Sequence, residues 1–253
     1  MIWLILVCII FYSGHYLFSL IREDKAGEAA YEKIRTSIKS EFTIQEKEEK
    51  RKKEQKAEEG KAGNTDNTLP TDNGKQTEHG AVDAQMWIQC EGTPIDYPVV
   101  QGKDNEYYLH HLPDGTPSSL GSIFIDAMNS PGLQDENTVL YGHHMNNGSM
   151  FASIDQYSSQ SYYEQHPYLF LYTKEQDYRI DLFAGYVGGN TSSLPLIFAT
   201  EEEFLGFIQT AKEKSTFTSD VQVQSGDKIV SLITCDYTFE DARYLLFGKL
   251  TAV

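Results

Sequence analysis

The sequence predicts a mainly β protein, a closed β-barrel of about eight strands with helical insertions, preceded by an N-terminal helical appendage. From about Asp83 onward, short apolar or alternating runs are separated by turn sequences such as "LPDGTPSS" and "NSPGLQDEN". Helical patterns do not alternate with these runs, which argues against a parallel βαβ architecture. The first 20 residues, in contrast, contain no Lys, Arg, Asp or Glu.

Seven segments have the composition expected of strands. They are residues 95–101, 121–126, 137–144, 167–173, 178–188, 221–235 and 243–253. The clearest helical pattern covers residues 200–214, where acidic residues come first and lysines come last, in agreement with the helix dipole. A shorter helix is expected over residues 149–157. Many short strands with few helices are typical of a closed barrel.

The N-terminal third predicts a membrane tether. Residues 1–21 are expected to form a transmembrane anchor, because a helix of this length spans about 30 Å, the thickness of the hydrocarbon core. A cleavable signal peptide is the alternative, but neither a basic start nor a small-residue cleavage site is clear. Residues 22–59 predict a charged helical stalk, residues 60–82 a flexible linker, and residues 83–253 the folded domain. Within the stalk, one helical face carries Tyr31, Ile34, Ile38 and Phe42.

Charge and cysteine content exclude several classes of function. Residues 81–253 contain 8 Lys and Arg against 23 Asp and Glu, and such an acidic domain would repel nucleic-acid phosphates. The three cysteines, Cys8, Cys90 and Cys235, are too few for a disulfide framework. No Cys or His cluster has the spacing of a metal site.

Three residues near strand ends suggest a nucleophilic site. Cys235 follows an apolar strand, and Arg243 opens the next one, so a hairpin would bring them to the same end of the barrel. A reactive thiol needs a positive neighbour or a base, and a guanidinium can stabilise an oxyanion. His143 and His144 stand at the end of another predicted strand, and only one of them can face the site, because adjacent strand residues point to opposite faces.

Each of these residues also has an ordinary structural interpretation. Cys235 could be a small buried hydrophobe, and Arg243 could form a surface salt bridge with Glu240 or Asp241. In that case the chain would be an anchored β-barrel binding module without enzymatic activity.

The motifs around these residues resemble those of the sortases, specifically class B. The stretch "SLITC" at residues 231–235 is similar to the TLxTC-like motif around the sortase nucleophile, and Arg243 follows in the next strand as in that family. The family's histidine follows a glycine, which fits "YGH" at residues 141–143. The similarity extends from about Ala84 to the C-terminus. Ser231 departs from the more common Thr but keeps the hydroxyl.

This resemblance implies a site and a reaction. Cys235 would be the nucleophile, His143, in preference to His144, the general acid and base, and Arg243 the group that stabilises substrate and oxyanion. Tyr141 and Thr234 are further substrate-binding candidates. The expected enzyme is a cysteine transpeptidase on the extracellular side of the cell membrane, with no metal or organic cofactor.

The resemblance also implies the partners. The enzyme would cleave an NPxTN-like or related C-terminal sorting motif of secreted proteins after Thr, through a thioester, and transfer them to an amine of a peptidoglycan precursor. A pilus-polymerising sortase that uses a pilin lysine as acceptor is an open alternative, as is a hydrolase that releases the acyl group to water. No nucleic-acid partner is implied.

Overall fold

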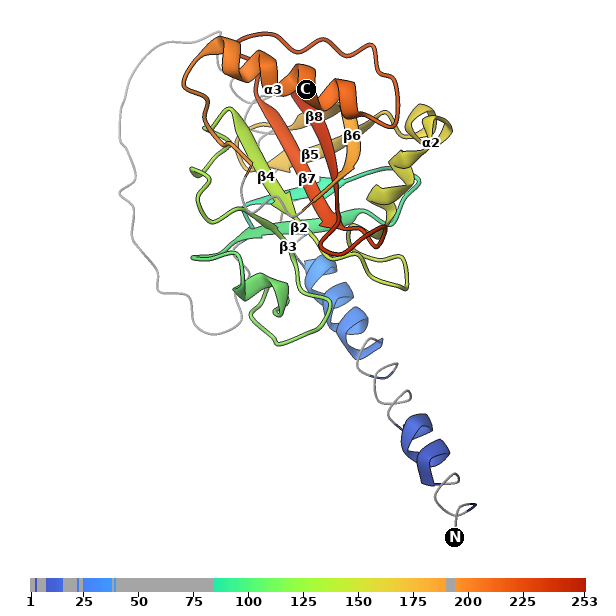
Figure 1. Ribbon diagram of the computed structural model, residues 1–253. Coiled ribbons are helices and arrows are strands. Elements are labelled where there is room, and N and C mark those ends of the chain that lie inside the picture. The colour runs from blue at the N-terminus through green and yellow to red at the C-terminus, as the bar shows by residue number, and fades with distance from the viewer. Residues whose placement is uncertain are drawn as a thin grey trace, which may run out of the picture.

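The computed structural model describes residues 3, 8–15, 22, 25–37, 39, 84–189 and 194–253. In this part of the chain, eight strands close into a barrel (Figure 1). The strands are β1 Met86–Gln89, β2 Asp96–Gln101, β3 Ile123–Ile125, β4 Asn137–Tyr141, β5 Tyr168–Thr173, β6 Tyr178–Gly188, β7 Ile229–Cys235 and β8 Arg243–Ala252. Within the barrel domain, the helices are the 3-10 helices η1 Tyr107–Leu109 and η2 Ala152–Ser158, with α2 Gln160–Gln165 and α3 Glu201–Lys214. The predicted mainly β class and closed barrel are confirmed.

The order of strands around the barrel brings distant parts of the sequence together. The order is β1-β2-β3-β4-β7-β8-β6-β5, and β5 closes the barrel by pairing with β1. Strand β7 lies between β4, to which it is parallel, and β8, to which it is antiparallel. The C-terminal ends of β4 and β7 therefore lie beside the start of β8.

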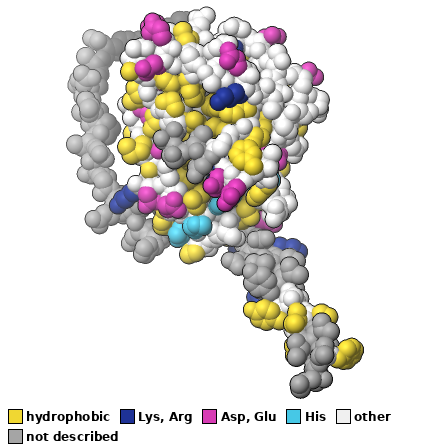
Figure 2. Space-filling view, viewed as in Figure 1, with side chains coloured by type: hydrophobic (Ala, Val, Ile, Leu, Met, Phe, Trp, Pro, Cys, Tyr) yellow, Lys and Arg dark blue, Asp and Glu magenta, His cyan; other side chains and the backbone are white. Residues whose placement is uncertain are grey.

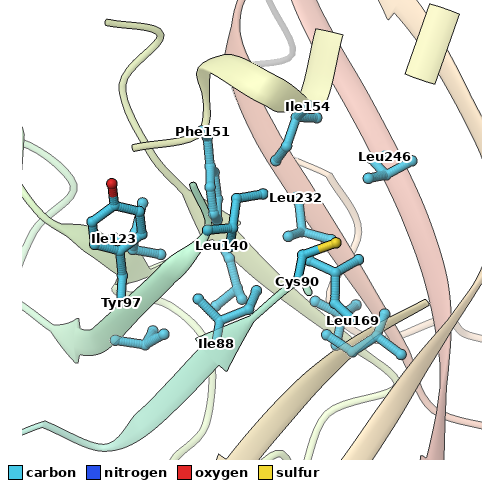
Figure 3. Close-up of a cluster of buried hydrophobic side chains, with 14 of the residues drawn as sticks. Ile88, Cys90, Tyr97, Ile123, Leu140, Phe151, Ile154, Leu169, Leu232 and Leu246 are labelled. Atoms are coloured by element: carbon cyan, nitrogen blue, oxygen red, sulfur yellow. The ribbon is translucent and has the colours of Figure 1, made fainter. Parts of the chain in front are cut away.

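Alternate residues of these strands face the barrel interior and an outer layer. The inward-facing residues of β7 and β8 include Val230, Leu232, Tyr244 and Leu246. Leu232 and Leu246 appear in Figure 3 among the buried side chains that fill the barrel. The outward-facing residues Ile229, Ile233, Leu245 and Phe247 pack in a second cluster with Phe204 and Ile208 of α3. Helix α3 therefore covers part of the outer wall formed by β7 and β8.

The start of α3 explains why the sequence pattern at residues 200–214 was informative. Thr200 is the N-cap, and its side-chain oxygen accepts a hydrogen bond from the backbone N–H of Glu203 at 3.2 Å. The Glu203 carboxylate in turn accepts from the N–H of Ala199 at 3.0 Å. The first turn is acidic and the last turn contains Lys212 and Lys214, which suits the helix dipole.

Two predicted segments differ from the structure. Residues 221–228 precede β7 without strand structure, since the turn at Ser225–Gly226 interrupts any ladder before Ile229. The helix expected over residues 149–157 is the 3-10 helix η2, which begins at Ala152. Strand β1 and helix α2 were not among the predicted elements.

Helical residues 25–37 lie against the barrel (Figure 1). Tyr31 is 4% exposed and belongs to the inner hydrophobic cluster, with Ala30 and Ile34 packed against it. The sequence predicts a helical stalk here, and these residues are helical. Their apolar face is covered by the barrel, however, so this part of the stalk is not a free spacer.

The remaining N-terminal predictions fall largely outside the described residues. Of the predicted anchor at residues 1–21, only residue 3 and helical residues 8–15 are described, and the predicted linker at 60–82 lies wholly outside. Within the described part of the chain, the structure contains no helix with the length and apolar character needed to span a membrane.

Candidate active site

Cys235 and Arg243 lie directly opposite each other at the end of the β7–β8 ladder. One position further along, the N–H of Asp236 donates to the carbonyl of Ala242 at 2.9 Å. Hydrogen-bonded and non-hydrogen-bonded pairs alternate along an antiparallel ladder, so Cys235 and Arg243 form a non-hydrogen-bonded pair. The Cα atoms of such a pair are about 4.5 Å apart, and the two side chains share one face.

The shared face is the outer face of the barrel wall. Cys235 has the same orientation as Ile233, and Arg243 the same as Leu245, and both of those residues pack in the cluster beneath α3. Both site residues are half-buried. One N–H of the Arg243 guanidinium donates to the carbonyl of Ala242 at 2.9 Å, which restrains the orientation of the planar group.

His143 reaches the same face from strand β4. Tyr141 is paired with Ile233 in the parallel β4–β7 ladder, and the N–H of Gly142 continues it by donating to the carbonyl of Ile233 at 3.1 Å. His143 lies two residues beyond Tyr141, and Cys235 lies two residues beyond Ile233. Because neighbouring strands are about 4.8 Å apart, this register brings His143 and Cys235 level with each other on adjacent segments.

A backbone carbonyl orients the imidazole of His143. Nε2 of His143 lies 2.7 Å from the carbonyl oxygen of Leu109, at the end of η1. A carbonyl oxygen only accepts hydrogen bonds, so Nε2 must carry a proton. In the neutral imidazole, Nδ1 is then the unprotonated nitrogen that can accept a proton from a thiol or return one to an amine.

Gly121 allows the carbonyl of Leu109 and the ring of His143 to approach each other. Its φ is 57°, in the left-handed region. A Cβ at this position would lie 2.7 Å from the oxygens of both Tyr108 and Leu109, and 3.0 Å from Cδ2 of His143. Only glycine fits here without displacing this arrangement.

His144 is engaged elsewhere. Its Nε2 lies 2.8 Å from a carboxylate oxygen of Asp155, and its ring meets the ring of Tyr237 edge-on at 5.2 Å between centroids. The hydroxyl of Tyr237 donates to the carbonyl of His144 at 3.2 Å. Through these contacts His144 links η2 to the β7–β8 loop, which is a structural role. They therefore favour His143 over His144 as the histidine of the candidate active site.

The two further substrate-binding candidates differ in orientation. Tyr141 lies on the outer face, and its hydroxyl donates to the carboxylate of Asp126 at 2.9 Å. Burial and the neighbouring Asp126 carboxylate raise the pKa of Tyr141, so the hydroxyl remains a donor. Thr234 is opposite Tyr244, which points into the barrel, and is 2% exposed. Its side chain therefore lies on the face away from Cys235, which does not favour a contact between that side chain and a substrate.

The cysteines occupy different environments. Cys90 is 2% exposed, with its thiol 3.7 Å from the hydroxyl of Tyr157, and burial raises the pKa of this thiol. All three cysteines are unpaired, and Cys235 is only partly buried. Cys90 is therefore a structural cysteine of the barrel core, whereas the side chain of Cys235 is partly accessible to solvent.

Sequence reasoning did not identify Leu109 or Gly121. Leu109 acts through its backbone carbonyl, which every residue has, so its side chain gives no indication. Gly121 precedes a predicted strand, where a glycine is ordinary. Only the contact with His143 distinguishes these two positions.

Apolar side chains surround the site on one face of the molecule. In Figure 2, hydrophobic side chains gather beneath α3, with acidic side chains around them and histidines at the lower edge. The outer cluster, with Ile233, Leu245 and the partly buried Tyr141 and Tyr186, extends along the wall from α3 toward Cys235. Ile233 and Leu245 are buried in this wall, whereas Tyr141 and Tyr186 are partly exposed and are available to contact a bound peptide.

Comparison with known proteins identifies the family. The Sortase domain family matches residues 88–251. Sortase B of Listeria monocytogenes is 37% identical over 169 residues, which is 65% of this chain and 68% of that protein. Sortase B of Staphylococcus aureus is 32% identical over 170 residues, 66% of this chain and 70% of that protein.

Solved structures agree with this result. Sortase B of Clostridium perfringens has a TM-score of 0.64 and 36% identity, covering 67% of this chain and 94% of that one. A Staphylococcus aureus sortase B–substrate complex has a TM-score of 0.70 and 28% identity, covering 91% of this chain and 99% of that one. The chain belongs to the sortase family, with class B enzymes as its relatives. It is thus a sortase-type cysteine transpeptidase, and the interpretation as a non-enzymatic binding module is not supported.

Proposed function

We propose that this protein is a membrane-anchored class B sortase that attaches secreted proteins to the cell wall. It would cleave an NPxTN-like or related C-terminal sorting motif after Thr and transfer the new carboxyl end to an amine of a peptidoglycan precursor. The observation that supports this proposal is the β4–β7–β8 ladder, in which Cys235 is paired with Arg243 and the strand that leads to His143 is paired with β7.

In the first half-reaction, Nδ1 of His143 takes the proton of the Cys235 thiol, and the sulfur attacks the carbonyl carbon of the Thr–X peptide bond. The carbonyl oxygen becomes an oxyanion, and the guanidinium of Arg243, on the same face, supplies charge-assisted donors to it. The C–N bond then breaks as His143 gives a proton from Nδ1 to the leaving amine. The products are a thioester on Cys235 and a released C-terminal fragment.

In the second half-reaction, the acceptor amine attacks the thioester. His143, now neutral with its proton on Nε2, takes a proton from the amine at Nδ1. The C–S bond breaks, an amide bond forms, and the sulfur of Cys235 leaves as a thiolate that recovers its proton from His143. The hydrogen bond to Leu109 holds the same nitrogen toward the reacting atoms in both steps.

Apolar residues near the N-terminus support the membrane-anchored part of the proposal. Helical residues 8–15 include Ile9, Ile10, Phe11 and Tyr12, which are 55–76% exposed, and Trp3 is 78% exposed. A membrane would cover such side chains. In that location residues 1–21 hold the catalytic domain on the extracellular side, where tethered enzyme and tethered substrate meet at a raised effective concentration.

Intact-mass spectrometry of the full chain in detergent tests the reaction. The protein is incubated with peptides that carry NPxTN-type or LPxTG-type motifs, beside Cys235→Ala. We expect an acyl adduct on the unaltered chain and none on Cys235→Ala, and we expect an added amine to discharge it. An adduct that forms on Cys235→Ala, or no adduct with any peptide, would refute the proposal. Discharge by water at the same rate with and without amine would indicate a hydrolase.

The role of His143 is tested separately from that of His144. His143→Ala should lower the rate of adduct formation by about 10²- to 10⁴-fold, because a positioned general acid is lost. His144→Ala should lower it far less, because His144 contacts Asp155 and Tyr237. Equal losses in the two variants would contradict the assignment of His143.

A further inference from the structure

We propose that the N-terminal helix formed by residues 25–37 is a positioning element of the active site, because it supports the two segments that flank His143. This inference rests on the proposed function of His143. The helix precedes the barrel domain by more than forty residues of sequence, and the sequence predicts it as part of a helical stalk with one apolar face. The contacts below give it a direct connection to the catalytic face.

The first flanking segment is the turn that follows the histidines. The ring of Tyr31 packs edge-on against the ring of Tyr97, with centroids 5.4 Å apart. The hydroxyl of Tyr97 accepts a hydrogen bond from the N–H of Met150 at 3.0 Å, and Met150 forms an isolated β-bridge with His144. Only the side chain of Tyr97 therefore lies between Tyr31 and the backbone of Met150, which is bridged to the residue after His143.

A second contact reaches the same turn from the helix surface. A carboxylate oxygen of Glu28 accepts a hydrogen bond from the side-chain amide of Asn147 at 2.6 Å. The other side-chain atom of Asn147, its oxygen, accepts from the N–H and the hydroxyl of Ser149 at 3.0 and 2.7 Å. Asn147 thus fixes the turn locally, and Glu28 fixes Asn147.

The turn that contains Asn147 and Ser149 also restrains the backbone of His143. The carbonyl of His143 accepts a hydrogen bond from the N–H of Phe151 at 2.9 Å. Met150, directly before Phe151, has a φ of 59°, a conformation that a residue with a side chain adopts at a cost unless its surroundings hold it. The contacts from Tyr97 and, through it, Tyr31 provide such surroundings.

The second flanking segment lies on the other side of the His143 ring. A Cβ at Gly27 of the helix would lie 2.9 Å from the hydroxyl oxygen of Ser118 and 3.0 Å from Cδ1 of Leu120, so the helix backbone packs closely here. Gly121 directly follows Leu120, and a Cβ at Gly121 would meet both the Leu109 carbonyl and the ring of His143. The helix therefore contacts the chain on both sides of the catalytic imidazole.

Positioning of this kind affects rate more than binding. A displacement of a catalytic group by about 1 Å can cost about 10²-fold in rate. In the described part of the chain, the helix packs with the inner hydrophobic cluster and not with the outer cluster, along which we propose that the peptide binds. Loss of the helix contacts should therefore lower kcat and leave KM nearly unchanged. A helix that merely stabilised the fold would change the folded fraction and leave the rate per folded molecule unaltered.

The experiment compares variants of the full chain in detergent, at a temperature where circular dichroism shows each to be folded. Glu28→Ala removes the acceptor for Asn147, and Glu28→Gln restores it, because a side-chain amide oxygen also accepts. Lys33→Ala, at an exposed position of the same helix, is the matched control. Tyr31→Ala removes the buried ring, and Tyr31→Phe retains it.

We expect Glu28→Ala to lower kcat about threefold, the size of one lost hydrogen bond, with Glu28→Gln and Lys33→Ala near the unaltered value. Tyr31→Ala should lower kcat at least about tenfold per folded molecule, with KM within about twofold, and Tyr31→Phe should retain activity. The proposal is overturned if Glu28→Ala equals Lys33→Ala, or if Glu28→Gln does not restore the rate. The comparison of Glu28→Ala with Glu28→Gln tests the proposal even if Tyr31→Ala does not fold.

A second readout does not depend on the sorting reaction. The rate of alkylation of Cys235 by iodoacetamide is measured against pH for the same variants, since in the proposed site the reactivity of the thiol depends on the placement of His143. We expect Tyr31→Ala, or Glu28→Ala alone if the former does not fold, to change this profile, and Lys33→Ala to leave it unchanged. An unchanged profile in Glu28→Ala and Tyr31→Ala would overturn the proposal. If the unaltered chain forms no acyl adduct, the proposed function fails, while the alkylation profile still tests the helix.

Discussion

Gly121→Ala should impair catalysis more than it impairs folding. The substitution has two costs. The first is the left-handed backbone, since φ is 57° and an L-residue pays about 1–2 kcal/mol there. The second is crowding, because the new Cβ would lie 2.7 Å from the carbonyl oxygen of Leu109 and 3.0 Å from Cδ2 of His143. Relief of this crowding must move the Leu109 carbonyl, which orients the imidazole, or the imidazole itself.

Gly132→Ala is the matched control for this experiment. Its φ is 72°, so the backbone cost is similar, but nothing lies within 4 Å of the new Cβ. We expect Gly132→Ala to lower Tm by about 2–8 °C and to leave kcat unchanged. Gly121→Ala should lower Tm by a similar or larger amount and also lower kcat by about 10- to 100-fold, as expected for a displaced catalytic group.

The assay is steady-state transfer of a sorting peptide to an added amine, measured well below the Tm of each variant and corrected for the folded fraction by calorimetry. The difference in kcat between Gly121→Ala and Gly132→Ala isolates the effect of crowding at His143. If the two variants turn over within about twofold of each other, the orientation of His143 by the Leu109 carbonyl does not contribute to catalysis. A role for the Leu109 carbonyl in placing the catalytic imidazole would then be refuted.

Two further predictions concern ionisable groups. In the native protein, iodoacetamide should modify Cys235 and spare Cys90, because Cys90 is buried and burial raises the pKa of its thiol; peptide mapping after labelling measures this, and equal labelling would contradict it. At Asp135, burial opposes ionisation, but hydrogen bonds from Asn129 and Ser130 outweigh it and hold the pKa of the carboxyl below its ordinary value of 3.8. The folded state thus favours the carboxylate, so its contribution to stability is present above pH 3.8 and is lost as the pH falls below that value. Asp135→Asn should lower Tm at pH 7 and should reduce the change of Tm with pH between pH 4 and about pH 3. If the slope of Tm against pH is unaltered, Asp135 does not contribute to the pH dependence of stability.

Much of the fold could be predicted from the sequence because its signals are local. The alternation within β6 and β8, and the acidic start and basic end of α3, are properties of neighbouring residues. The strand prediction was wrong at residues 221–228, where an alternating sequence has no partner strand, and β1 was missed because its four residues are too short for periodicity to be distinctive.

The chemistry of the site was also largely contained in the sequence. Cys235, Arg243 and His143 stand at strand ends, and the "SLITC" and "YGH" motifs named a family that the comparisons confirm. Thr234 was selected with them because it belongs to the same motif, but its alternation with Cys235 turns its side chain into the barrel.

The sequence by itself determined the residue types, their order and the strand ends at which they stand, because hydrophobic period and turn chemistry are encoded locally. Tertiary structure decided which groups meet. The parallel pairing of β4 with β7 brings His143 level with Cys235, and the carbonyl of Leu109 selects the proton-carrying nitrogen. Helical residues 25–37, predicted as part of a stalk with one apolar face, pack that face against the barrel. Such contacts join residues far apart in the chain, and backbone groups that are identical in every residue gain a specific role only through their position in space.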